Sequence, residues 1–398
     1  MSTISAVSPL KYSERELLSF LLSDAQSKGN PVAVWRLPGA DIVQVIISEN
    51  YRELAPEALL EDQESGFLFA PFDKARPRLF LKADHLLAFR NGALIQSETA
   101  LEQRSYDWLQ TLLPLRMPPR FNPSVTHVPL SKDAGKESFL ALVEAGLEEI
   151  ERGTFEKIVP SRTRTITLPP SFDIIQAFQK LCVSYPQALI SFVSIPGVGT
   201  WLGASPEVLA CVKEKRIFKT VALAGTLPYT QGTDLRSVAW TQKEIEEQAL
   251  VERYVISCFK KIRLREYDEH GPKTVVAGNL MHLKSDFTVD IQATNFPQLG
   301  SVMLDLLHPT SAVCGMPLQT SLDFLRTHES YDRSFYSGYL GPVNVHNNIE
   351  IFVNLRCMQV CGNEGVLYAG AGVTIDSIPE QEWAETEMKF NTLLNVIL

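Results

Sequence analysis

The sequence predicts an α+β fold in which the strands pair antiparallel. Strand-like runs follow one another with only short turns between them, at Pro196-Gly197, Asn347-Asn348 and Asn363. Short turns connect antiparallel neighbours, whereas parallel strands need long crossover connections. We therefore expect an α+β protein rather than a doubly wound parallel sheet.

The first third of the chain predicts a helix over SERELLSFLLSDAQSKG, ended by Gly29, and strands over ADIVQVIIS and SGFLFAPF. Residues 113–132 then predict an extended connector, because five prolines interrupt any regular element. These are Pro114, Pro118, Pro119, Pro123 and Pro129. We expect a soft boundary near residue 130. Residues 1–130 would form a strand and helix region of the same compact unit as the functional domain over 131–398.

The remaining elements are predicted in chain order. KESFLALVEAGLEEIERG has the periodicity of an amphipathic helix, and EKIVPSRTRTITL that of one strand. QALISFVSIPGVGTWLGASPEVLACV predicts two or three strands, followed by a helix over about 240–262. A meander of strands from SGYLGPVNV to YAGAGVT precedes a last helix that begins near residue 379.

The composition limits the kinds of molecule that the protein is expected to bind. The chain has 398 residues, a formal charge of -9 and 45% hydrophobic residues, which indicates a globular protein without a basic surface for nucleic acid or anionic membranes. It has no apolar run of about 18 residues, and its start lacks the basic-then-apolar layout of a signal peptide. We expect a cytoplasmic protein that acts on a small molecule. Neither the six cysteines nor the seven histidines have metal-ligand spacing.

The last predicted helix carries charges beside its apolar stripe. At 100° per residue, Glu382, Glu385 and Lys389 fall within about 60° of one another. Acidic residues at a helix start and an i, i+4 ion pair are also ordinary surface features. The preceding Gly370 and Gly372 would let the backbone approach a ligand closely.

The helix near 240–262 places Glu247 inside an apolar face, with Glu244 one turn before it. A buried carboxylate must be paired, protonated or bound to a metal; the alternative is a glutamate that reaches solvent near the helix start. Two helices that each present an interior carboxylate would suit Mg²⁺, which takes oxygen ligands.

Two cationic residues raise a similar question. Alternation in EIFVNLRCMQV, read as one strand, directs Arg356 into a covered space, where it needs an anion or an internal carboxylate partner. Lys157 begins a predicted strand. A lysine there is either solvated or, if desolvated, able to act as a base.

Residues 136–395 contain a series of separated motifs. These are FEKIVPSR, WLGASPEVL, ALAGT, KEIEEQALV, HPTSAVCGMP, SYDRSFYSGYLG, VNLRC, YAGAGV and EQEWAETEMK. Their order and spacing resemble those of the chorismate-using enzymes, a family that includes anthranilate synthase component I, aminodeoxychorismate synthase, isochorismate synthase and salicylate synthase. The resemblance implies two large packed antiparallel sheets with helices outside, as in anthranilate synthase component I.

The resemblance also implies roles for individual residues. Glu247 and Glu385 resemble magnesium ligands, with Glu244 and Glu382 acting nearby or through water. The ion would hold the ring carboxylate of chorismate. The implied substrate contacts are the amides of Gly225 and Thr226, the enolpyruvyl-carboxylate site of Arg356, Lys389, Tyr336 and the Gly370 amide, and the pocket histidine His308.

Two residues within the matching segments distinguish between the reactions of the family. Lys157 stands where ammonia-using members carry glutamine, and Ala224 stands where aminodeoxychorismate synthases carry a lysine. This favours addition of water at ring carbon 2 with loss of the carbon 4 hydroxyl, with Lys157 as base and Glu207 as acid. The implied protein is an isomerase, a magnesium-dependent isochorismate synthase without an obligatory amidotransferase subunit.

Alternatives remain open at this point. Tyr336 resembles the salicylate-forming members, which form isochorismate and then eliminate pyruvate, whereas Ala312 resembles the isochorismate-forming members. Anthranilate synthase component I and a non-catalytic chorismate-binding protein are further alternatives. AGTLPYTQG, HPTSA and Glu247-Gln248 depart from the family pattern without removing an assigned ligand. The sequence does not distinguish menaquinone from siderophore biosynthesis.

Overall fold

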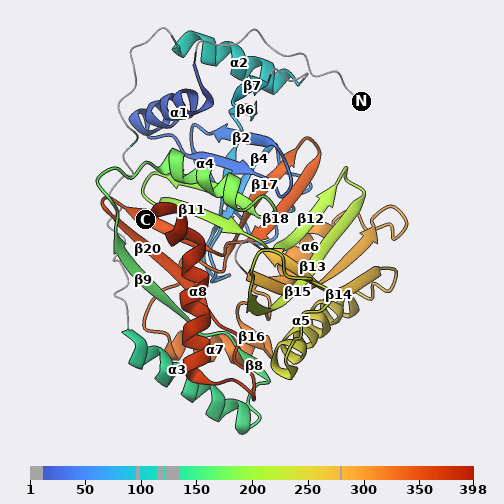
Figure 1. Ribbon diagram of the computed structural model, residues 1–398. Coiled ribbons are helices and arrows are strands. Elements are labelled where there is room, and N and C mark those ends of the chain that lie inside the picture. The colour runs from blue at the N-terminus through green and yellow to red at the C-terminus, as the bar shows by residue number, and fades with distance from the viewer. Residues whose placement is uncertain (1–11, 96–98, 114–120, 122–134, 278–279) are drawn as a thin grey trace.

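A computed structural model describes residues 12–95, 99–113, 121, 135–277 and 280–398 (Figure 1). Two antiparallel nine-stranded sheets dominate these residues, and helices lie outside them. The predicted α+β fold with two large packed sheets is confirmed. The proline-rich connector over 113–132 lies almost entirely outside the described residues. The predicted boundary near residue 130 therefore stays a prediction.

The first sheet joins strands from both ends of the chain, and every neighbouring pair is antiparallel. Its order is β7 (Ala93–Ile95), β6 (His85–Arg90), β2 (Ile42–Ile47), β1 (Val32–Arg36), β10 (Leu189–Ile195), β11 (Gly199–Ser205), β19 (Cys357–Cys361), β20 (Glu364–Gly370) and β9 (Ser161–Thr167).

The second sheet is built in the same way, from strands distant in sequence. Its order is β14 (Asp268–Ala277), β15 (Leu280–Asp290), β13 (Ile217–Pro228), β12 (Val208–Lys213), β18 (Asn348–Val353), β17 (Tyr339–Val345), β4 (Gly66–Ala70), β5 (Arg78–Lys82) and β3 (Tyr51–Leu54). Strands from before residue 100 thus belong to both sheets. A separate short pair joins β8 (Lys157–Ile158) to β16 (Gly315–Met316).

Aromatic side chains hold the two sheets face to face. Trp35 of the first sheet lies 5.2 Å from Phe67 of the second, measured between ring centroids. Trp201 of the first sheet likewise meets Phe69 of the second, at 6.2 Å. Trp35, Phe67 and Phe69 are fully buried and Trp201 nearly so. Such rings each remove 150–250 Å² from water, which makes this layer the main hydrophobic core.

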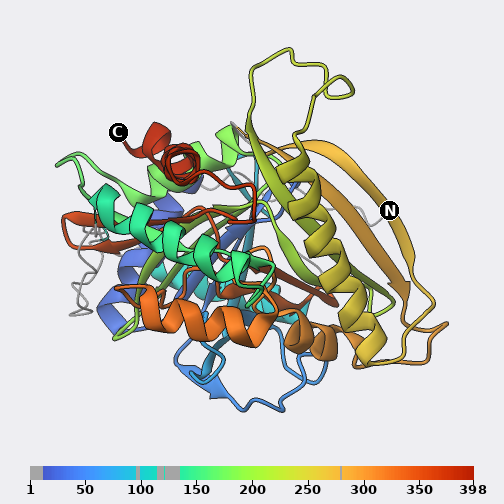
Figure 2. The ribbon, with the colours of Figure 1, turned by 90° about the horizontal axis from the view of Figure 1, so that it is seen from below.

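The helices divide between the two outer faces (Figures 1 and 2). On the first sheet, α1 (Glu14–Lys28), α4 (Ile174–Ser184) and α8 (Pro379–Ile397) share a second buried cluster with strand residues such as Phe192. On the second sheet, α5 (Gln242–Lys261) packs on β13 and β15, and α6 (Leu299–Leu307) packs on β12. The remaining described helices are α2 (Ala100–Leu112), α3 (Gly135–Glu151) and α7 (Leu318–His328).

Two of the points at which the chain crosses between the sheets are adjacent in space. β11 of the first sheet leads into β12 of the second, and β18 of the second leads into β19 of the first. The expectation of one continuous strand over EIFVNLRCMQV was therefore wrong, because residues 354–356 connect two sheets. The strand predicted over EKIVPSRTRTITL is also interrupted, at Pro160. Both corrections place a candidate site residue beside a break.

Candidate active site

Glu207 and Arg356 lie on the two crossovers, and backbone hydrogen bonds hold the crossovers together. The Val353 amide donates to the Glu207 carbonyl at 3.0 Å, and the Ala204 amide donates to the Arg356 carbonyl at 3.1 Å. Arg356 has a left-handed backbone with φ 48°. Such a conformation costs on the order of 1–3 kcal/mol and persists only where the surroundings enforce it.

The Glu207 carboxyl is buried, with one long hydrogen-bond contact. The hydroxyl of Thr310 approaches Oε1 at 3.5 Å. Burial raises the pKa of Glu207 to about 7, although the positive charges of Lys157, Arg356 and Lys389 act in the opposite direction. An acid with this pKa is a suitable proton donor near neutral pH.

Lys157 is fully buried, so it is not the solvated strand end that was one of the two alternatives. Its Nζ donates to Glu247 Oε1 at 2.9 Å, and Glu247 is itself 7% exposed. The predicted interior orientation of Glu247 is thus confirmed. Gly372 makes this approach possible, since a Cβ there would lie 2.2 Å from Glu247 Oε1.

The charges of α8 face the start of α5. Lys389 Nζ is 2.6 Å from Glu385 Oε1 and donates to the Gly370 carbonyl at 2.8 Å. Lys243 Nζ lies 2.6 Å from Glu382 Oε1 and 4.0 Å from Glu385 Oε2. These ion pairs connect α8, which covers one sheet, with α5, which covers the other.

We call these six side chains the ion cluster: Lys157, Lys243, Lys389, Glu247, Glu382 and Glu385. Their carboxylates differ in protonation. Burial and repulsion by Glu385 raise the pKa of Glu382. Burial would also raise the pKa of Glu385, but Lys389 and Lys243 hold it below its ordinary value.

Arg356 is linked through a histidine to the irregular part of β13 at residues 224–226. His282 Nδ1 bonds the Gly225 carbonyl at 2.7 Å, and His282 Nε2 lies 3.4 Å from Arg356 Nη2. A proton on Nδ1 satisfies both contacts, since Nε2 then accepts from the guanidinium. Burial, reinforced by Arg356, lowers the pKa of His282 to about 3. The imidazole is therefore neutral at physiological pH.

Tyr336 lies close to Gly370. A Cβ at Gly370 would be 3.2 Å from the Tyr336 hydroxyl, and the Tyr336 ring stacks on Tyr368 at 5.3 Å. Tyr336 also contributes to the electrostatic environment of Arg356, together with Glu385 and Glu207. The structure thus groups both catalytic candidates with Arg356, Tyr336, Gly370 and Lys389.

A comparison with known proteins decides the family. Residues 79–398 match the family described as chorismate binding enzyme. The chain belongs to this family. It is 30% identical to isochorismate synthase EntC of Escherichia coli (strain K12) over 246 residues, which is 61% of this chain and 62% of EntC. The match thus spans less than two thirds of that relative.

Other members resemble more of the chain. The salicylate biosynthesis isochorismate synthase of Pseudomonas aeruginosa is 28% identical over 386 residues, covering 87% of this chain and 77% of that protein. The solved structure of MenF, the menaquinone-specific isochorismate synthase of E. coli, has the same fold, with a TM-score of 0.74, 22% identity and coverage of 95% of this chain and 91% of its own. Anthranilate synthase component I of Streptococcus pneumoniae also has this fold, with a TM-score of 0.64, 19% identity and 91% and 89% coverage.

Some residues that resemblance to the family singles out lie apart from the ion cluster. Glu244 Oε2 accepts from the Thr241 amide at 3.1 Å and from the Thr241 hydroxyl, so this carboxylate caps α5. His308 Nε2 lies 3.1 Å from the Phe72 carbonyl. Thr226 lies in β13, beside Gly225. The proposed metal and substrate roles of these three residues stay predictions.

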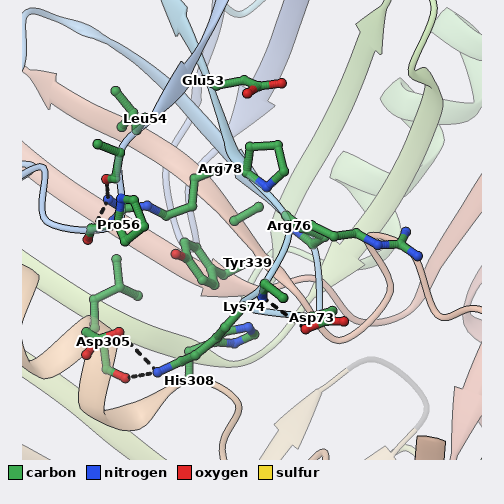
Figure 3. Close-up of a pocket in the computed structure, with 16 residues that line it drawn as sticks. Glu53, Leu54, Pro56, Asp73, Lys74, Arg76, Arg78, Asp305, His308 and Tyr339 are labelled. Carbon is green, nitrogen blue, oxygen red and sulfur yellow. Dashed lines mark hydrogen bonds and ion pairs between the residues drawn. The ribbon is translucent and has the colours of Figure 1, made fainter.

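His308 borders a different cavity of about 460 Å³ (Figure 3). Cations line it, but Lys74 already bonds the carbonyl and carboxylate of Asp305, and Arg78 bonds the carbonyls of residues 55, 56 and 58. A smaller cavity of about 190 Å³ reaches Arg356 and Pro206, beside the crossovers. Of the candidate site residues, Arg356 lines this smaller cavity.

Sequence reasoning missed Lys243, His282 and Thr310. Lys243 is part of the KEIEEQALV motif, where a lysine before the carboxylates was a visible signal. Thr310 directly follows His308-Pro309 and belongs to a quoted motif. His282 lies in a strand without any motif, so nothing local could have revealed its contact with Arg356.

Proposed function

We propose that the protein is an isochorismate synthase, a magnesium-dependent isomerase that interconverts chorismate and isochorismate. One observation carries the proposal: a fully buried lysine, Lys157, lies close enough for its charge to act on Glu207, a buried carboxyl with a pKa of about 7. A carboxyl with this pKa suits proton donation near neutral pH. Isochorismate synthases among the relatives support this assignment.

The residues present fit a divalent metal ion. Glu247, Glu382 and Glu385 supply carboxylate oxygens, the ligands that Mg²⁺ prefers. Both oxygens of Glu382 are buried without a hydrogen bond of acceptable geometry among the described residues. These residues form no preformed group of three or more metal-binding side chains in the described part of the chain, because lysines separate the carboxylates. When bound, the ion would stabilise negative charge on the substrate's ring carboxylate.

Chorismate is a dianion, and the site offers cations for its second carboxylate. Arg356 is half-buried, and the contact recorded for its guanidinium is with neutral His282, not with a carboxylate. We propose that Arg356, Tyr336 and Lys389 bind the enolpyruvyl carboxylate. A planar guanidinium can bind a carboxylate through two parallel hydrogen bonds.

The reaction needs one proton removed and one supplied. Lys157 Nζ would take a proton from the water that attacks ring carbon 2, while Glu207 donates its proton to the hydroxyl that leaves carbon 4 as water. The ring double bond shifts between these positions, so atoms and charge balance. Lys157 is ion-paired with Glu247 in the structure, and this contact must open before Nζ can accept a proton.

The proposal extends to the domain organisation, the location and the subunits of the enzyme. We propose that residues 1–130 belong to one compact unit with 131–398, and that the protein acts in the cytoplasm without an amidotransferase subunit. No helix in the described ranges is long and apolar enough to cross a membrane. The buried Lys157 favours water over ammonia as nucleophile.

The test is to incubate the purified protein with chorismate and Mg²⁺ and to identify the products by chromatography. Isochorismate is the expected product. Salicylate with pyruvate would instead identify a salicylate synthase, and anthranilate formed only with ammonia would contradict both assignments. Chorismate that binds without turnover would indicate a non-catalytic binding protein.

A further inference from the structure

Lys243 contacts the two carboxylates of α8 that would hold a metal ion. Its ammonium is 2.6 Å from Glu382 and 4.0 Å from Glu385. The Lys243 side chain is only 12% exposed, and that of Glu382 is fully buried. Lys243 belongs to the first turn of α5, so this one cation connects the two helices that would share the metal.

Glu382 depends on this cation for compensation of its charge. Among the described residues, neither oxygen of Glu382 accepts a hydrogen bond of acceptable geometry. A buried carboxylate without a partner is destabilising by several kcal/mol or becomes protonated. Lys243 supplies this compensation, because its ammonium lies 2.6 Å from Glu382 Oε1.

The ion cluster is electrically balanced without any metal. Its three lysines face its three glutamates, and each glutamate has a lysine within 4.0 Å. A divalent cation added to this balanced group would place two uncompensated positive charges in a buried space. Lysine carries its charge on a flexible four-carbon stem, so Lys243 can withdraw while α5 stays in place.

We propose that Lys243 is an internal counter-cation, which holds Glu382 and Glu385 in the metal-free protein and is displaced when a divalent ion binds. The inference rests on the proposed function, which supplies the metal. It implies that the ion binds the free protein weakly, because it competes with an ammonium group. A dianionic substrate restores the charge balance, so metal and substrate favour one another's binding.

The experiment measures metal binding in the absence of chorismate, with Mn²⁺ as the probe. Electron paramagnetic resonance reports free Mn²⁺ and gives its dissociation constant for wild type and for Lys243→Met, which keeps the chain length and removes the charge. We expect the variant to bind Mn²⁺ about tenfold more tightly or better, because the ion no longer competes with an ammonium group for the carboxylates of Glu382 and Glu385. Its metal-free form should melt below wild type, and Mn²⁺ should reduce the difference.

Lys82→Met is the matched control. Lys82 is 51% exposed and pairs with Glu64 on the surface, and both variants take the net charge from -9 to -10. The control should bind Mn²⁺ within twofold of wild type. If Lys243→Met does not fold, Lys243→Gln is measured in its place, because it keeps an N–H donor without the charge.

Equal or weaker Mn²⁺ binding by Lys243→Met would overturn the counter-cation role. Absence of Mn²⁺ binding in every protein, with and without chorismate, would overturn the metal site and this inference with it. The product assay without added metal separates the two failures, since isochorismate formed there would leave the proposed reaction standing.

Discussion

The two sides of the site treat the same residue type in opposite ways. Glu207 is buried with one hydroxyl near it, and burial raises its pKa to about 7. Glu385 is also buried, but two lysines lower its pKa. At Glu207 burial outweighs the positive charges nearby, whereas at Glu385 the lysines outweigh burial. The comparison teaches that a directly bonded cation, such as Lys389 on Glu385, decides the direction of the pKa shift.

The largest expected effect comes from removing Lys157, a fully buried member of the ion cluster. Lys157→Met leaves Glu247 buried without its 2.9 Å partner, and loss of one member of a buried pair costs about 3–5 kcal/mol. We expect the free energy of unfolding to fall by that amount in urea titrations, and turnover to be lost because the base is absent.

A second substitution separates these two effects. Lys157→Met combined with Glu247→Gln removes both charges, so it should recover most of the stability while turnover stays absent. Recovery of turnover would show that Lys157 is not the base. Unchanged stability in the single variant would show that the pair is not buried in solution.

On the acid side, Glu207→Gln keeps the shape and removes the proton. We expect kcat to fall by about 10²–10⁴ with little change in KM, measured with chorismate at saturating Mg²⁺. A loss in KM alone would make Glu207 a binding residue and not the acid.

The same variant tests the pKa of Glu207 through stability. Because the folded-state pKa is about 7, above the ordinary 4.5, the folded protein holds this proton more tightly than the unfolded chain. Its stabilising contribution is present below about pH 4.5 and is lost as the pH rises through 7. Relative to Glu207→Gln, wild type should lose roughly 3 kcal/mol between pH 5 and pH 8, and a pH-independent difference would contradict the shift.

The smallest expected effect concerns the backbone behind the ion cluster. Gly372→Ala would place a Cβ 2.2 Å from Glu247 Oε1, and overpacking of this kind costs about 1–3 kcal/mol. Thermal melting should show the loss, with Mn²⁺ affinity also reduced. Gly203→Ala serves as control, because its nearest atom is Cys357 Cβ at 3.1 Å; an equal loss in both would remove the special role of Gly372.

The sequence predicted the elements better than their connections. Helices over 240–262 and from residue 379 agree with α5 and α8 within two residues, because apolar periodicity is a local property. The crossovers at residues 206–207 and 354–356 were missed, since strand alternation does not report which sheet a strand joins. Burial of Glu247 was predicted from its position in an apolar face. The placement of Lys243 between two carboxylates depends on α8, more than 130 residues away, and no local pattern encodes it.

The central claim is that a buried base and acid exchange water for a ring hydroxyl. The most direct test converts chorismate in H₂¹⁸O with Mg²⁺ and examines isochorismate by mass spectrometry. Water addition at carbon 2 predicts one ¹⁸O atom in the product, and no product with Lys157→Met. Isochorismate without ¹⁸O, or equal product from the variant, would contradict the account.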